Sequence, residues 1–173
     1  HPGIQFNVAC TQSLLSLSRS EADLALRFTR NPTETLVGRC LASAAYCIYA
    51  ASGETGKRFT AANRSDWPWI GVHDDAYNRV IFGSVLPEVR FKHQADSMEA
   101  MQLMVRNGLG VTLLPCYVAD QDPSLRRVEP DPIPGVSFEL WILYHPDVRR
   151  VSRIRLFADF IAEVISRDLD LFE

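Results

Sequence analysis

Side chains that could carry out chemistry are few in this 173-residue sequence, and they are scattered. No G-x-S-x-G, H-E-x-x-H or P-loop motif is present. A metal site could be built from His73, the aspartates that follow it and the distant His93, but no further ligand pattern supports one. The sequence therefore favours neither a hydrolase nor another enzyme, and it implies no cofactor. The histidines are His1, His73, His93 and His145.

The clearest chemical feature is the start of a predicted helix in the stretch Asp96–Asp120. Asp96, with Glu99 three residues later, is typical of a capped helix start. Methionines at helical spacing predict a helix over Ser97–Asn107, and Gly108 is typical of the residue that ends one. Unpaired amides and the helix dipole at such a start favour an anionic group.

The elements around this helix predict where its start lies. Val89–Gln94 alternates like a strand, and Leu109–Pro115 reads as a short buried strand that Pro115 stops. Val89–Leu114 is thus predicted to be a strand–helix–strand unit with a parallel sheet and a right-handed crossover. Ligands of open α/β sheets bind at the carboxyl ends of the strands, so the helix start and the segment after Pro115 are candidate contacts.

Further elements follow from hydrophobic periodicity. The unbroken apolar run Ala22–Phe28 favours a buried parallel strand. Ser152–Arg167 has an apolar face typical of an amphipathic helix. Strands are also predicted over Ile4–Ala9, Cys40–Ser52, Trp67–Val72 and Phe138–Tyr144, and helices over Gln12–Ser18 and Asp75–Leu86.

Composition bounds the class of protein. Hydrophobic residues make up 47% and charged residues 23%, which is typical of a globular chain with one domain or two small lobes. No apolar run is long enough for a membrane span, and the N-terminus does not look like a secretory signal. With a net charge of −3 and no strong basic cluster, this chain is not expected to bind DNA through its own charge.

The four cysteines form no C-x-x-C pair, and each has apolar neighbours in the sequence. We interpret them as small buried hydrophobic residues in a reducing compartment, in line with a cytoplasmic location. Zinc ligands would be spaced more tightly. These residues are Cys10, Cys40, Cys47 and Cys116.

Four segments, in this order and spacing, resemble the effector-binding domain of LysR-type transcriptional regulators. The most specific is the G-L-G-V-x-x-L-P box after a helix, followed by the A-D-L-A-L-R run. The resemblance covers nearly the whole chain. The segments are "SEADLALRF", "LVGRCL…YCIYAA", "SMEAMQLMVRNGLGVTLLPCYVAD" and "LWILYHPDVRRVSRIRLFADFI".

The resemblance implies an α/β fold of the periplasmic-binding-protein-like type 2 class, with two lobes and a ligand cleft between them. Lobe I is expected to comprise His1–Ala50 and Val136–Glu173, and lobe II to comprise Ala51–Gly135. The sequence starts at the part of the family pattern that follows the first strand and helix. We therefore expect that strand, the winged helix-turn-helix domain and its linker helix to be missing.

The resemblance also implies a function and partners. A small metabolite, anionic or aromatic, would bind between the lobes, and the resulting shift would reach DNA only through the missing N-terminal domain. The family pattern implies a homodimer, a tetramer in the full-length protein, and no membrane partner. An exported solute-binding receptor of the same fold is the alternative.

Family position and the strand-end rule suggest the effector contacts. For each of them, capping, turn formation or core packing is the competing interpretation. Trp67 and Trp69 are expected to pack in lobe II rather than to stack on an effector. The arginines between residues 149 and 155 are expected to form a solvated surface. The expected effector contacts are Thr11, Phe28, Thr29, His73, Asp74, Ser97, Met98 and Pro115.

Overall fold

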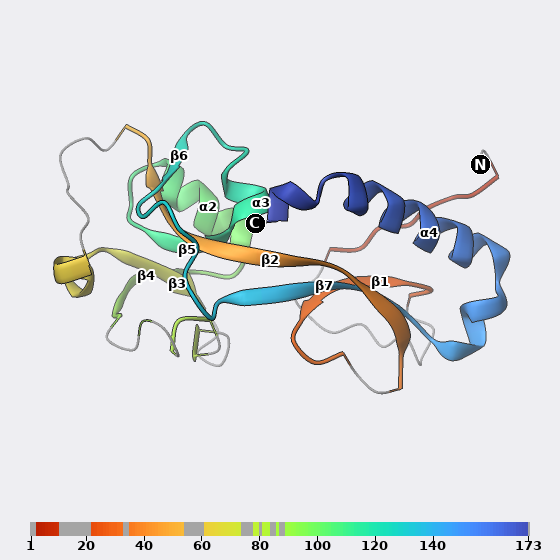
Figure 1. Cartoon of the computed structure of the whole chain (residues 1–173). Helices are drawn as coiled ribbons and strands as arrows, with labels where there is room; N and C mark the ends of the chain where they lie inside the picture. Colours follow the sequence, from red (N-terminus) through yellow and green to blue (C-terminus); the bar gives the residue numbers. More distant parts are fainter. Residues whose placement is uncertain are drawn as a thin grey trace. The chain divides into compact units, whose positions relative to one another are not determined.

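The computed structural model divides into two compact units (Figure 1). Unit 1 comprises His1–Ser43 and Phe138–Asp170, and unit 2 comprises Ala44–Ser137 and Leu171–Glu173. The predicted lobe boundaries stay predictions. The structure describes residues 3–10, 22–32, 35–53, 61–73, 78–79, 81–83, 86 and 89–172.

The sheet of unit 1 joins segments that are distant in sequence. β1 (Ala25–Thr29) pairs antiparallel with β7 (Ser137–Tyr144), which in turn pairs with β2 (Val37–Ala51). The strands approach so closely at Gly38 that a Cβ there would lie 1.9 Å from the carbonyl oxygen of Ile142. Glycine is therefore required where β2 meets β7.

Two strand predictions for unit 1 are wrong. The run Ala22–Phe28 does not form a buried parallel strand, because β1 is antiparallel to β7 and its side chains alternate between half-buried and exposed. Ile4–Ala9 has no strand structure and is largely exposed. Phe6 from this segment packs against Phe157, with ring centroids 4.7 Å apart. The helix predicted over Gln12–Ser18 lies outside the described residues.

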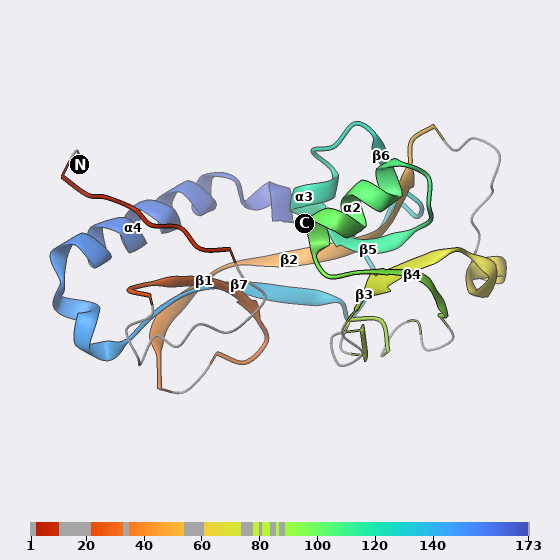
Figure 2. The ribbon, with the colours of Figure 1, turned by 180° about the vertical axis from the view of Figure 1, so that it is seen from behind.

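The amphipathic helix of unit 1 is confirmed at both ends. α4 (Ser152–Arg167) follows a short 3-10 helix, η3 (Pro146–Arg150), and buries Ile154 and Ala158. Arg39 of β2 donates to the carbonyl oxygen of Ala158 over 3.2 Å, which ties the helix to the sheet. Figures 1 and 2 show α4 alongside these strands from both sides.

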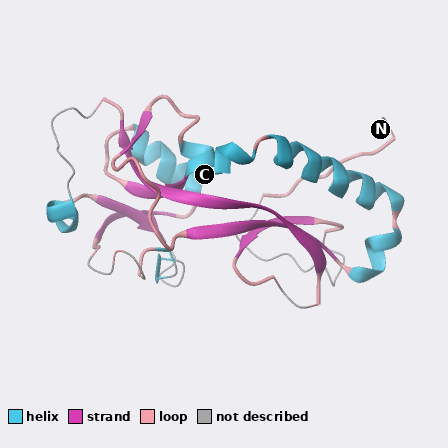
Figure 3. Ribbon diagram, in the orientation of Figure 1, coloured by secondary structure: helices cyan, strands magenta, loops and turns pink. Residues whose placement is uncertain are grey.

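Unit 2 contains the predicted strand–helix–strand unit with parallel strands, which is confirmed, while the right-handed crossover stays a prediction (Figure 3). β3 and β4 are parallel, and a further parallel bridge joins Trp69 of β3 to Val111, directly before β5. α2 connects β4 to β5 and packs on all three strands. The second part of β2 pairs antiparallel with β5 and β6. The bounds are β3 (Trp69–Val72), β4 (Phe91–Ala95), α2 (Met98–Arg106), β5 (Thr112–Pro115), α3 (Cys116–Ala119) and β6 (Leu125–Arg127).

Two glycines shape the turn between α2 and β5. Gly108 has a φ of 71° and donates its N–H to the carbonyl oxygen of Val105 over 2.9 Å, which ends the helix as predicted. At Gly110 a Cβ would lie 1.8 Å from the carbonyl oxygen of Pro68. Only glycine lets the chain pass this close to the backbone that leads into β3.

The core of unit 2 lies between α2 and the sheet. Trp67 and Trp69 are buried and stack with ring centroids 5.6 Å apart, so their predicted packing role is confirmed. Of the helix predicted over Asp75–Leu86, the structure describes only part, and residues 78, 79 and 81 are helical. No helix among the described residues is long and apolar enough to cross a membrane. The core cluster comprises Cys47, Tyr49, Ile70, Met101, Val105, Leu114, Cys116, Ala119 and Leu125.

Candidate functional site

The start of α2 is capped by Ser97. Its backbone is extended, with φ −144° and ψ 157°, and its Oγ accepts the N–H of Ala100 over 3.2 Å. The sequence-based assignment of the cap to Asp96 is therefore wrong by one residue, since the turn places the Ser97 hydroxyl against the helix amides. Asp96 precedes the cap and is exposed.

The ends of two parallel strands meet beside this helix start. β4 ends at Ala95, and the N–H of His73, directly after β3, donates to the Ala95 carbonyl over 2.7 Å. The side chain of Asn78 holds the end of β3 by accepting from Val72 N–H over 2.9 Å and donating to its carbonyl over 2.6 Å. His73 and the Ser97 turn therefore lie at one fixed edge of the sheet.

The start of α2 offers hydrogen-bond donors. Among the described residues, the structure shows no acceptor for the N–H groups of Met98 and Glu99, as is typical of the first turn of a helix. The Ser97 Oγ uses a lone pair for the cap, so its proton is still available to a ligand. The exposed carboxylates of Asp96 and Glu99 oppose a highly charged anion at the same place. A single carboxylate or a neutral acceptor is the best match.

Two other predicted contacts in unit 2 have packing roles. Met98 is half-buried against the core cluster beneath α2. Pro115 is fully buried, pairs with Tyr46 across the sheet and precedes the first residue of α3. These positions favour the structural interpretation of both residues, and their contact with an effector stays a prediction.

The predicted contacts in unit 1 follow β1. Phe28 is 37% exposed and lies opposite Leu140 of β7. The Oγ1 of Thr29 accepts the N–H of Asn31 over 3.1 Å in a local turn. The structure thus brings Ser97, Met98 and His73 together in unit 2, and Phe28 and Thr29 together in unit 1. Thr11 and Asp74 lie outside the described residues.

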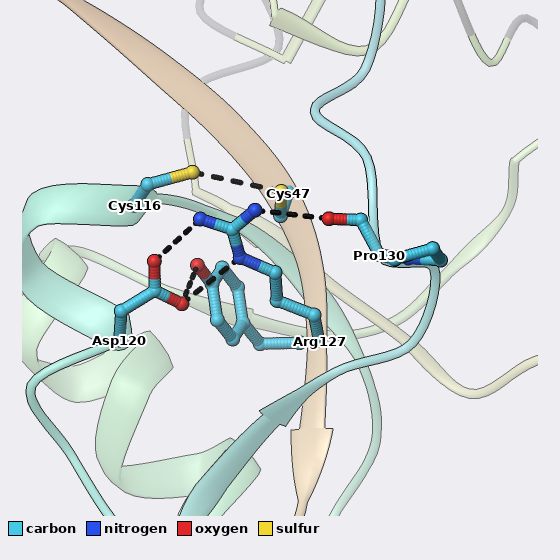
Figure 4. A network of polar contacts seen from close by, with 6 residues as sticks. Cys47, Cys116, Asp120, Arg127 and Pro130 are labelled. Atoms are coloured by element: carbon cyan, nitrogen blue, oxygen red, sulfur yellow. Dashed lines mark hydrogen bonds and ion pairs between the residues drawn. The ribbon is translucent and has the colours of Figure 1, made fainter. Parts of the chain in front are cut away.

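Sequence reasoning missed a second group of polar side chains in unit 2 (Figure 4). Arg127 of β6 donates to Asp120 through Nε over 3.0 Å and through a terminal nitrogen over 2.5 Å, and also to the carbonyl of Pro130 over 2.9 Å. The hydroxyl of Tyr49 donates to Asp120 over 2.7 Å. The bonds from Arg127 and Tyr49 hold the pKa of Asp120 below its usual value despite partial burial.

A pair of cysteine thiols lies beside this network. Cys47 of β2 and Cys116 of α3 are both 0% exposed, and their Sγ atoms are 3.5 Å apart. The pKa of Cys116 is lowered, first by the hydrogen bond that Cys47 can donate to its thiolate and also by the positive charge of Arg127, although burial acts in the opposite direction. For the same reason the pKa of Cys47 is raised. One thiolate is therefore stabilised within the pair.

The expectation that all four cysteines are buried holds only for this pair. Cys10 and Cys40 are exposed, so it is wrong for both. Cys40 lies in the part of β2 that faces solvent, where a short apolar-looking run is not core. The only sequence signal for the buried group is the alternation that puts Cys47 and Tyr49 on one face of β2. Nothing in the sequence links them to Cys116, Asp120 or Arg127.

No group of three or more His, Cys, Asp or Glu side chains within the described part of the chain is arranged to hold a metal ion. His93 lies in β4 and is half-buried, while Asp74 and Asp75 are not described. The arginines predicted to form a solvated surface are exposed as expected. They are Arg149, Arg150, Arg153 and Arg155.

Known structures share this fold. The regulatory domain of CrgA, a LysR-type transcriptional regulator from Neisseria meningitidis, matches with a TM-score of 0.78 and 18% identity, covering 90% of this chain and 81% of that one. The longer CrgA structure matches with a TM-score of 0.83 and 18% identity, covering 95% of this chain but 59% of that one. The effector domain of AmpR from Pseudomonas aeruginosa matches with a TM-score of 0.73 and 15% identity, covering 90% and 77%.

A search of curated proteins gives no match. The family model described as the LysR substrate binding domain matches residues 1–166. Domains of this family have the periplasmic-binding-protein-like type 2 fold, which confirms the predicted fold class. The chain belongs to the LysR substrate-binding domain family.

Proposed function

We propose that this chain is the effector-sensing domain of a LysR-type transcriptional regulator and that the start of α2 binds the effector. The observation that carries this proposal is the edge where β3 and β4 end, beside the capped first turn of α2. Parallel strands of α/β proteins present their ligand sites at this edge. The family match supports the sensing role.

The chemistry of this edge suggests the kind of effector. The Ser97 hydroxyl and the first amides of α2 are donors, and they suit one carboxylate or carbonyl group. Asp96 and Glu99 are exposed next to it and disfavour several negative charges. His73 lies exposed at the end of the neighbouring strand. We therefore propose a small monocarboxylate, aliphatic or aromatic, whose charged end meets the Ser97 turn.

Other parts of the site remain proposals from the family pattern. Phe28, Thr29 and Thr11 would supply contacts from lobe I, and Asp74 and Pro115 from lobe II. The two lobes and the cleft between them belong to the same proposal. An effector that binds one conformation of the domain more tightly than another shifts their populations, and it does so only by the difference in affinity.

The response would reach DNA in a longer protein. The related structures are described as transcriptional regulators, which supports a regulatory rather than an enzymatic role. We propose that the DNA-binding part is a separate N-terminal domain and that the regulator works in the cytoplasm as a homodimer, or as a tetramer at full length. The exported-receptor alternative is decided by fractionating the native protein.

The experiment begins with a thermal-shift screen of small monocarboxylates against this chain. A ligand that binds the folded chain raises its melting temperature by mass action. Each hit is then titrated by calorimetry into the chain and into Ser97→Thr, Ser97→Asp and Phe28→Ala variants. Threonine and aspartate both keep a capping oxygen, but aspartate adds a negative charge where the carboxylate is expected to bind.

We expect Ser97→Thr to bind within a few-fold of the unchanged chain and Ser97→Asp to lose at least tenfold in affinity. The matched control is Ser152→Asp, which adds the same charge to the first residue of α4 at an exposed position. Unchanged affinity in both Ser97→Asp and Phe28→Ala contradicts the proposed site. A screen in which no carboxylate binds contradicts the proposed effector class.

A further inference from the structure

The buried thiols of Cys47 and Cys116 have a geometry that core packing alone does not require. Cysteine is often buried as a small apolar residue. Here the two sulfurs are 3.5 Å apart, although the residues are 69 positions apart in sequence. They come from a strand and from the first residue of a helix, so two separate backbone segments bring them together.

The surroundings of the pair suit oxidation chemistry. Arg127 lies next to the thiols, and its guanidinium group is held by both oxygens of Asp120 and by the carbonyl of Pro130 (Figure 4). A fixed positive charge and a hydrogen bond from the second thiol favour the thiolate form of Cys116. Thiolates, not thiols, react with peroxides.

We propose that Cys47 and Cys116 form an oxidation site at which a hydroperoxide converts the two thiols into a disulfide. This site lies in unit 2 and does not depend on the effector site at the start of α2. Cys116 is the residue that reacts first, and Cys47 is the one that closes the bond. Disulfides have a sulfur–sulfur bond of about 2.05 Å, so the atoms must approach by about 1.5 Å.

The first step uses the thiolate of Cys116. Its sulfur attacks one oxygen of the hydroperoxide, the O–O bond breaks, and an S–O bond forms. The leaving alkoxide or hydroxide takes up a proton from water, and Cys116 becomes a sulfenic acid. Since the thiols are buried, the hydroperoxide reaches them during local opening of the unit, and oxidation is slower than at an exposed cysteine.

The second step uses the thiol of Cys47. Its sulfur attacks the sulfenic sulfur, an S–S bond forms, and the S–O bond breaks. The leaving hydroxide combines with the thiol proton to give water. Across both steps two thiols lose two electrons in total, and the hydroperoxide gains them as it becomes an alcohol, or water, plus one further water.

The test uses the full chain with Cys10→Ser and Cys40→Ser, which removes the exposed thiols. The folded chain is exposed to hydrogen peroxide, quenched, unfolded and treated with N-ethylmaleimide, which labels any free thiol. Trypsin cleavage after Arg39, Lys57, Arg106 and Arg126 puts the two thiols on different peptides, 40–57 and 107–126. Mass spectrometry then shows whether these peptides are linked.

We expect a linked pair of peptides, lighter by two hydrogens than their sum and separated by dithiothreitol. The unmodified chain is treated in parallel, and oxidation of Cys10 there shows that the oxidant was active. Peptides 40–57 and 107–126 that both carry the maleimide label under these conditions overturn the proposal. Sulfinic or sulfonic acid at Cys116 without any linked peptide overturns it as well.

Two further variants on the same background test the assigned order. In Cys47→Ser, the hydroxyl can still donate to the Cys116 thiolate but cannot close a disulfide, and dimedone should trap the sulfenic acid of Cys116 on peptide 107–126. In Cys116→Ala, the positive charge of Arg127 still acts on Cys47, but the residue assigned to react first is gone, and dimedone should label peptide 40–57 at least tenfold more slowly. Equal rates in the two variants overturn the assignment of Cys116 as the first residue to react.

Discussion

Two helices of unit 2 follow the strands β4 and β5, yet their starts differ in chemistry. α2 follows β4, is capped by the Ser97 hydroxyl, and leaves donors next to exposed side chains. α3 follows β5, has no side-chain cap, and begins with a thiol that is 0% exposed. The first helix start thus has side chains and donors that solvent can reach, whereas the first residue of the second helix is buried.

The difference follows from what lies beside each turn. The α2 start is next to the ends of β3 and β4, where His73 and Asp96 face solvent. The α3 start lies against β2, and beside it Tyr49 and Arg127 both donate to Asp120, whose side chain is itself partly exposed. A group whose donors are paired stabilises the fold, whereas unpaired donors at an open edge are available to a ligand.

The largest expected effect is that of Gly110→Ala, which disturbs β3 and β5 together, the strands that lead to His73 and to α3. The new Cβ would lie 1.8 Å from the carbonyl of Pro68, so β5 must move away from the backbone before β3. We expect the free energy of unfolding to fall by ~3 kcal/mol. Urea denaturation followed by tryptophan fluorescence measures it, with Gly53→Ala as the control because no atom lies within 4 Å of a Cβ there. A loss no larger than that of the control contradicts the close approach.

Arg127→Met is expected to affect the α3 start and to leave the α2 start unchanged. It removes three hydrogen bonds at the α3 start and leaves the carboxylate of Asp120 with Tyr49 alone. We expect a loss of ~2 kcal/mol in the free energy of unfolding, with effector affinity unchanged. Urea denaturation measures the free energy of unfolding, and calorimetry measures the affinity for the effector.

The matched control for Arg127→Met is Arg106→Met, whose ion pair with Asp122 involves a half-exposed arginine. We expect it to lose less than ~1 kcal/mol. An equal loss in both variants shows that the Asp120 network contributes no more than a surface pair. A weaker affinity for the effector in Arg127→Met shows that the two helix starts are not independent.

Ser97→Ala is expected to act on the α2 start with a smaller effect on stability. It leaves the N–H of Ala100 without its acceptor, which costs ~1 kcal/mol in the free energy of unfolding. Ser97→Asp keeps an acceptor and should restore most of that loss. Denaturation curves of both variants at pH 7 measure how much the Ser97 cap contributes to the free energy of unfolding. A Ser97→Ala chain that is as stable as the original contradicts the expected contribution.

The smallest expected effect is the pH dependence that Asp120 adds. Its pKa lies below its usual value when the chain is folded, because Arg127 and Tyr49 bond to the carboxylate. The stability from these bonds is fully present above the unfolded-state pKa and is lost as the pH falls through the folded-state pKa. Between about pH 2 and pH 5, the free energy of unfolding should depend less steeply on pH in Asp120→Asn than in the unchanged chain. Urea denaturation at several pH values measures this dependence, and identical dependences contradict the lowered pKa of Asp120.

The same two regions show how far the sequence could be interpreted. The unit from β4 through α2 to β5 was predictable, because methionine spacing, Gly108 and Pro115 act within a few residues of one another. The cap was misplaced by one residue, since Asp96 and Ser97 are both good capping residues and only the backbone of the turn selects between them.

The group of side chains around Cys47 and Cys116 was not predictable in the same way. Cys47 and Cys116 meet only because β2 pairs with β5, a contact between segments about seventy residues apart. The prediction for β1 was wrong for a related reason. Its apolar residues are typical of a buried parallel strand, but it pairs antiparallel with β7, which is distant in sequence. Local patterns predict elements, whereas the pairing of distant strands decides which side chains meet.

The most direct test is a nuclear magnetic resonance titration of the isotope-labelled chain with the best carboxylate from the thermal-shift screen. At 19.5 kDa the chain suits backbone amide spectra. We predict the largest shift changes at the amides of Met98, Glu99 and His73, with those of Cys116 and Arg127 little changed. Changes centred on α3 and β6, with the first turn of α2 unaffected, would contradict the assignment of the open helix start as the effector site.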